Sequence, residues 1–280
     1  MMANYCSQEL ECERIIVESE DTDVLLLSMF HFARLKRFCE IFVRRGGRYV
    51  HVHTVVLRLA EKCNVSMQTI TAALLSGFAL TGCDTVSYPF RRGKKRAAKI
   101  ILSSPLCLEV FSDFEAVAPD IEGPVLDEAR NFMIRLDNKE AISSLNILRQ
   151  HMFAQNKSEL RSLPPTEDAF KQHVLRALYQ LRWWKHAHES NPIIPSVTEF
   201  GRNVLNNCLV PITTLLLQFP TYIDVPSFCK CKSSKCQSSR CSCVKADVIC
   251  TIACACATSA DGCSREQVVE VEESESEHEF

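Results

Sequence analysis

The cysteines are the residues of this chain whose spacing most clearly suggests a chemical role, because nine of the 16 lie between positions 229 and 263. The nine are Cys229, Cys231, Cys236, Cys241, Cys243, Cys250, Cys254, Cys256 and Cys263. Thiols can form disulfides or, as thiolates, bind a soft metal ion such as zinc. The choice between these chemistries decides what this part of the chain does.

The number and spacing of these cysteines favour metal over disulfides. An odd number cannot pair completely, and the C-x-C pairs at 229/231, 241/243 and 254/256 are too close to bridge internally without strain. Residues 1–8 show no basic segment followed by an apolar one, so we expect no export to an oxidising compartment. We therefore expect reduced thiolates.

Tetrahedral zinc can account for all nine thiolates if some are shared. Three zinc ions need twelve Zn–S bonds, and nine thiolates supply twelve if six bind one ion and three bridge two. The alternative is two separate four-cysteine sites, which would leave one thiol over.

The spacing C-x-C-x4-C-x4-C-x-C-x6-C-x3-C-x-C-x6-C resembles that of a tesmin-like CXC domain, a module with nine cysteines and three zinc ions found in DNA-binding proteins. The resemblance implies an irregular zinc-cluster module over residues 229–263. The six residues between Cys256 and Cys263 exceed the usual gap of about two, which makes Cys263 the ligand that fits the pattern least well.

In such domains the residue before the fourth cysteine enters the DNA minor groove, and that position is Arg240 here. An arginine is attracted to a narrow minor groove by its negative potential. The resemblance therefore implies DNA as partner, with phosphate contacts from the neighbouring lysines. These lysines are Lys230, Lys232, Lys235 and Lys245.

A charge count supports an alternative interpretation of these basic residues. Three Zn²⁺ and nine thiolates sum to −3, while the five basic side chains against Asp247 and Asp261 give +3. The lysines could thus serve only to neutralise an anionic cluster. In that case the module would be a structural or protein-binding zinc knot.

A second set of candidate residues consists of carboxylates near predicted strand and helix ends. Asp21 and Asp23 follow a predicted strand at 14–17 and begin an apolar helix at 24–35, and Asp84 follows a helix that Ser66 caps. Clustered carboxylates could hold Mg²⁺ for phosphodiester cleavage. Helix capping by Asp21 or Thr22 is the competing explanation.

The order of strand, S-E-D-T-D, helix, A-L-T-G-C-D and G-K-K-R-A-A-K resembles the second half of the flap-endonuclease core, a PIN-like α/β fold. The resemblance assigns Asp21, Asp23 and Asp84 to a magnesium site. The family's other acidic residues have no counterpart within the 20 residues before Asp21. We therefore expect an incomplete site, either because the sequence is a fragment of a longer protein or because the fold serves as an inactive scaffold. A Mg²⁺-dependent nuclease is the alternative.

The remaining elements are mostly helical. We predict strands at 40–44 and 49–53 joined by Gly46-Gly47, and helices at 54–62, 66–78, 93–99, 125–136, 144–154 and 166–188. His173, His186 and His188 on the last helix are interpreted as packing or surface residues rather than ligands. A proline-rich connector follows, with one short helix at 212–218.

The regions together resemble a family of mobile-element-derived animal proteins that join a degenerate nuclease-like region, a helical segment containing L-P-P-T-E-D-A-F, and a CXC domain. We expect five regions: a truncated PIN-like α/β core (1–110), a mainly helical region (111–190), the connector (191–228), the zinc module (229–263) and a disordered acidic tail (264–280). No apolar run is long enough to cross a bilayer. A nuclear, DNA-binding zinc protein is the function these features favour.

Overall fold

The computed structural model describes residues 12–34, 39–114, 122–137, 142–154 and 159–216, and then 229–231, 236, 239–247, 250 and 254–256. The chain forms two compact units, residues 1–216 and residues 217–280. Unit 1 combines a small sheet with helices, so the predicted mixed α/β class is confirmed. The likeness to a PIN fold stays a prediction. The acidic tail also stays a prediction, since it lies outside the described residues.

The sheet of unit 1 contains β1 (Arg14–Glu18), β2 (Glu40–Arg45) and β3 (Arg48–His51) in that order. β1 and β2 are parallel, with Ile15 opposite Ile41, and are connected through α2 (Thr22–His31) and the 3-10 turn η1 (Phe32–Arg34). β2 and β3 form an antiparallel hairpin at Gly46-Gly47, as predicted. Ile41 and Val43 of β2 face the core.

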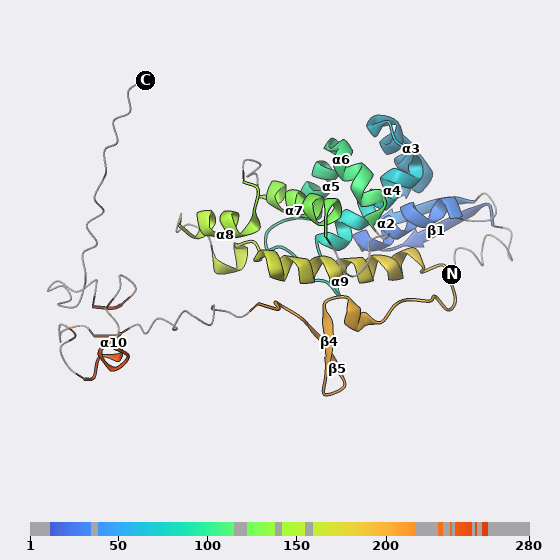
Figure 1. Ribbon diagram of the computed structural model, residues 1–280. Coiled ribbons are helices and arrows are strands. Elements are labelled where there is room, and N and C mark those ends of the chain that lie inside the picture. The colour runs from blue at the N-terminus through green and yellow to red at the C-terminus, as the bar shows by residue number, and fades with distance from the viewer. Residues whose placement is uncertain are drawn as a thin grey trace, which may run out of the picture. The chain divides into compact units, whose positions relative to one another are not determined.

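The helices that follow are α3 (Val52–Cys63), α4 (Met67–Leu80), α5 (Lys94–Ser103), α6 (Pro105–Ser112), α7 (Pro124–Leu136), α8 (Leu145–Ala154) and α9 (Glu167–Lys185). α4 lies at the centre, in contact with α2, α3, α5, α6 and α9 (Figure 1). Every residue from Ile70 to Leu80 is buried, as expected for a helix that is apolar all round. One hydrophobic core runs from Leu26 to Phe200.

No single helix among the described residues is long and apolar enough to span a membrane. The pair α3–α4 reaches the required length and composition only together, and it is broken by a bend of 96°.

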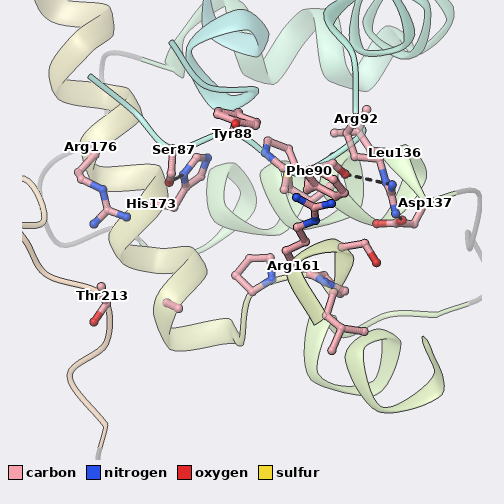
Figure 2. Close-up of a pocket in the computed structure, with 17 residues that line it drawn as sticks. Ser87, Tyr88, Phe90, Arg92, Leu136, Asp137, Arg161, His173, Arg176 and Thr213 are labelled. Carbon is pink, nitrogen blue, oxygen red and sulfur yellow. Dashed lines mark hydrogen bonds and ion pairs between the residues drawn. The ribbon is translucent and has the colours of Figure 1, made fainter. Parts of the chain in front are cut away.

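Helix α9 connects several parts of unit 1 through buried polar side chains. The Nε2 of His173 donates a hydrogen bond to the carbonyl of Leu80 (2.8 Å), and Nδ1 accepts one from Ser87 Oγ (3.1 Å; Figure 2). Since a carbonyl only accepts, the proton lies on Nε2. Burial lowers the pKa of His173 to about 4, so the ring is neutral at pH 7. Its interpretation as a packing residue is confirmed.

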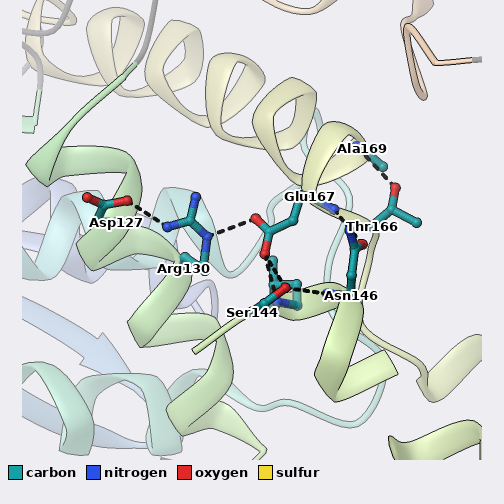
Figure 3. Close-up of polar contacts among 8 residues, drawn as sticks. Asp127, Arg130, Ser144, Asn146, Thr166, Glu167 and Ala169 are labelled. Atoms are coloured by element: carbon teal, nitrogen blue, oxygen red, sulfur yellow. Dashed lines mark hydrogen bonds and ion pairs between the residues drawn. The ribbon is translucent and has the colours of Figure 1, made fainter. Parts of the chain in front are cut away.

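The start of α9 is held by a second network, centred on Glu167 (Figure 3). Its carboxylate accepts hydrogen bonds from Arg130 Nε (2.8 Å) and from the backbone N–H of Leu145 (2.7 Å). Thr166 Oγ1 accepts from Ala169 N (3.4 Å), which confirms the predicted cap. The network ties α7, α8 and α9 together.

After α9 the structure differs from the sequence prediction. The chain continues through η4 (Val197–Glu199) into a hairpin of β4 (Arg202–Leu205) and β5 (Cys208–Pro211). Its two-residue turn, Asn206-Asn207, has φ of 50° and 59°, which suits a type I′ turn and the tolerance of Asn for positive φ. The short helix predicted at 212–218 is absent at residues 212–216, and residues 217 and 218 lie outside the described part.

Gly201 allows the hairpin to lie close to α9. It has φ of +66°, and a Cβ there would meet the carbonyl oxygen of Gln172 at 2.6 Å. Glycine is thus required by both the conformation and the close approach. Arg176 of α9 donates from Nη1 to the carbonyls of Gly201 (3.1 Å) and Ile212 (2.6 Å), which fixes both ends of the hairpin.

Candidate metal centre

The described part of unit 2 has little regular structure. Its one helix there is the single turn α10 (Ser242–Lys245), for which Cys241 is the N-cap. The backbone N–H of Ala255 donates to the carbonyl of Cys229 (2.9 Å), which brings the two ends of the cysteine run together. Cys236 has φ of 57°, a conformation uncommon for residues other than glycine. This irregular backbone turns the cysteine side chains inward.

In the described part of unit 2 the buried side chains are cysteines. Seven of the predicted ligands are at most 3% exposed, and Cys231 packs against them with Val244. The buried seven are Cys229, Cys236, Cys241, Cys243, Cys250, Cys254 and Cys256. Eight of the nine predicted ligands therefore lie in one cluster, and the ninth, Cys263, is outside the described residues.

Two groups of four sulfur atoms can each hold a metal ion, since their members all lie within 4.8 Å of one another. The first group is Cys229, Cys250, Cys254 and Cys256, and the second is Cys229, Cys236, Cys241 and Cys250. Cys229 and Cys250 belong to both groups. Four buried thiolates are the ligand set that zinc prefers in structural sites, so this cluster can bind zinc.

The distances between sulfur atoms fit metal binding better than disulfides. Cys229 Sγ lies 3.5 Å from Cys236 Sγ and 3.4 Å from Cys256 Sγ, and Cys243 Sγ lies 3.6 Å from Cys254 Sγ. A disulfide needs about 2.05 Å. Tetrahedral zinc with Zn–S bonds of about 2.3 Å places its ligands about 3.8 Å apart. The described cysteines are all free thiols.

The pKa values of the thiols differ within the cluster. Burial raises the pKa of Cys229, but the backbone N–H of Cys231 and the thiols of Cys256, Cys236 and Cys241 outweigh burial and lower it to about 5. Burial and the hydrogen bond with Cys254 raise the pKa of Cys243 to about 11. Thiols such as Cys243 must therefore release protons when a metal binds, which makes metal affinity dependent on pH.

The basic residues proposed for DNA are only partly described. Arg240, Lys230 and Lys245 are exposed, and Arg240 lies in the turn directly before Cys241. They are therefore accessible to a partner, whereas Lys232 and Lys235 lie outside the described residues.

The three aspartates predicted for magnesium are not members of the ligand groups found among the described residues, and the magnesium site stays a prediction. Among the described residues, the groups of three or more His, Cys, Asp or Glu side chains that converge are the two cysteine groups. Asp21 instead caps α2, accepting from the N–H of Asp23 (2.9 Å), and Asp23 forms an ion pair with Lys94 (3.0 Å). Asp84 is an exposed turn residue. The capping explanation holds for Asp21.

Comparison of the chain with protein-family models, curated proteins and solved structures finds no match.

Proposed function

We propose that unit 2 is a zinc module in which nine thiolates hold three zinc ions. The observation that carries the proposal is the sharing of Cys229 and Cys250 by both four-sulfur groups. Two separate sites would have no common ligand, whereas a cluster with bridging thiolates requires some. Cys263 completes the ligand count. Zinc here is structural: it takes the place of an apolar core, because the buried residues in the described part of the unit are cysteines.

The module is further proposed to bind DNA in the nucleus. Support comes from the exposure of Arg240 beside a ligand, Cys241, since bound metal would fix the adjoining backbone and hold the guanidinium outward. Lys230 and Lys245 are exposed and would contact phosphates, together with Lys232 and Lys235. The nuclease-like region of mobile-element origin would serve as scaffold. A protein-binding zinc knot is the competing function, supported by the near-neutral charge sum.

The zinc content is tested by native mass spectrometry of the full chain. Three zinc ions are expected, and two would contradict the shared cluster. Cys229→Ser removes a ligand from both groups, so it should cost more zinc than Cys254→Ser, which affects one. Equal losses would contradict the bridging role of Cys229.

DNA binding is tested with an A/T-rich duplex at fixed salt. Arg240→Ala should weaken binding about tenfold, equivalent to about 1.4 kcal/mol. Arg58→Ala, which changes an exposed arginine on α3, is the matched control and should have no effect. If the zinc-loaded protein has no affinity for DNA, the DNA-binding proposal is wrong and the protein-binding zinc knot is favoured. Cleavage of branched DNA in Mg²⁺, abolished by Asp84→Ala, would overturn the inactive scaffold.

A further inference from the structure

A buried arginine without a carboxylate partner separates two pockets on unit 1. The first pocket, of about 300 Å³, lies between α9 and the segment around Phe90 (Figure 2), and the second, of about 680 Å³, lies beside the β4–β5 hairpin. Ser87, Arg176 and Thr213 line both pockets. These three residues therefore form the boundary between them.

Arg176 is 7% exposed, and the hydrogen bonds that its side chain forms with other described residues are the two from Nη1 to backbone carbonyls. Within the part of the chain that the structure describes, no carboxylate forms an ion pair with this guanidinium. Burial and the nearby Arg202 both lower its pKa, so the cation is destabilised where it lies. A buried charge of this kind favours a bound anion.

The charge of the pocket walls adds to this preference. Four arginines line the two pockets: Arg92, Arg161, Arg176 and Arg202. The one carboxylate in the lining is Asp137, which is ion-paired with Arg92, and Arg161 is ion-paired with Glu159 outside the lining, so the preference for an anion rests on Arg176 and Arg202. The hydroxyl of Thr213, which lines both pockets with Arg176, is a further donor, whereas the Ser87 hydroxyl already donates to His173 Nδ1. The junction of the pockets thus offers the groups that bind a phosphate.

Aromatic side chains occur on both sides of this junction. Tyr88, 72% exposed, lines the first pocket, and Trp183, 43% exposed, lines the second together with Tyr179. Guanidinium groups stack on neighbouring rings, Arg161 on Phe90 at 4.1 Å and Arg202 on Tyr179 at 5.7 Å. Basic grooves with interleaved aromatic rings are typical of proteins that bind single-stranded nucleic acid.

We propose that this surface binds single-stranded nucleic acid, with a phosphate at Arg176 and the two flanking bases in the two pockets. A duplex does not fit this arrangement, because its bases are stacked inside and cannot enter separate pockets. A free nucleotide has the same chemistry but would fill one pocket. The site lies within unit 1 and does not depend on the zinc module.

The test uses the zinc-loaded full chain and a 12-nucleotide oligothymidylate. The chain contains two tryptophans, Trp183 and Trp184, so stacking of a base on Trp183 should quench the fluorescence. Arg176→Gln should weaken binding about tenfold and reduce the salt-dependence slope by about 0.7. Trp183→Leu should also weaken it about tenfold and remove most of the quenching. Arg58→Gln is the matched control and should change nothing.

Three comparisons decide the ligand. Thymidine monophosphate binding as tightly as the oligonucleotide would overturn the strand assignment, as would an equally tight 12-base-pair duplex. A polyglutamate peptide that quenches Trp183 in an Arg176-dependent manner would assign the site to a protein instead. Absence of quenching by the oligothymidylate itself would also overturn the proposal.

Two further controls separate this site from the zinc module and from misfolding. Arg240→Ala should leave the quenching intact, and loss of quenching in that variant would contradict a site in unit 1. Arg176→Gln also removes hydrogen bonds to the hairpin, so its thermal unfolding is compared with that of wild type. Trp183→Leu changes a partly exposed residue and keeps the test valid if Arg176→Gln unfolds.

Discussion

The two units of this protein bury different kinds of side chain. In unit 1 the core consists of aliphatic and aromatic side chains, with Phe111, Phe114 and Phe132 in edge-to-face contact at its centre. In the described part of unit 2 every buried residue is a cysteine. Buried hydrocarbon stabilises a fold in proportion to its area, whereas buried thiols do so mainly through a metal. Unit 1 should therefore fold by itself and unit 2 only with metal.

Metal removal should separate the units most clearly. A chelator should unfold unit 2, because structural zinc supplies about 10–16 kcal/mol in comparable small modules. Hydrogen exchange of peptides from residues 229–256 should become fast, while peptides from α4 stay protected. Zinc added back should restore the protection. Loss of protection in α4 would show that unit 1 depends on the metal.

A core substitution should affect unit 1 alone. Phe132→Ala should lower its free energy of unfolding by about 3–5 kcal/mol, because it leaves a cavity beside Phe111. Phe153, 64% exposed on α8, is the matched control, and Phe153→Ala should change the value by less than about 0.5 kcal/mol. Denaturant unfolding measures both. A change in zinc content with Phe132→Ala would contradict the independence of the units.

Acid should destabilise unit 1 through His173. Its pKa falls from 6.5 to about 4 on folding, so protonation favours the unfolded chain. The stabilisation is complete above pH 6.5 and is lost as the pH falls toward 4, by about 3 kcal/mol in total. His173→Gln should remove this part of the pH dependence, whereas the exposed His151→Gln should not. If the free energy of unfolding depends on pH in the same way in both variants, His173 is not the responsible group.

The smallest expected effect concerns a helix cap. Ser66 Oγ accepts a hydrogen bond from Thr69 N (3.0 Å) at the start of α4, and Ser66→Ala should cost about 1 kcal/mol. Ser103→Ala changes an exposed serine at the C-terminal end of α5, where no backbone N–H needs a partner, and should be nearly neutral. Thermal unfolding resolves the difference. Equal effects would show that the cap contributes nothing.

The sequence predicted those elements whose signals are local. The caps Ser66 and Thr166 and the turn Gly46-Gly47 mark element ends, because each satisfies or bends the neighbouring backbone without help from distant residues. The hairpin after α9 was missed although Asn206-Asn207 is a turn signal, since the prolines around it suggested a connector. Its position depends on the contact of Gly201 with α9, which no local pattern reveals.

The candidate sites show the same limit. The cysteine spacing predicted a cluster, but it could not show which sulfur atoms converge, because that depends on the backbone reversal between Cys229 and Ala255. Arg176 gave no signal, since its environment is made by Ser87 and Thr213 from distant parts of the chain. The spacing of the aspartates suggested a magnesium site, but in the structure Asp21 caps a helix.

The membership of Cys229 and Cys250 in both four-sulfur groups has a consequence for how the module responds to its surroundings. When two ions share ligands, the first to bind already orders part of the site for the second, so partly loaded molecules are rare. The module would then pass from empty to full over a narrow range of free zinc. With the proposed loading, oxidation of either shared thiol would release more than one ion at once, so Cys229 and Cys250 would be the most sensitive positions of the unit.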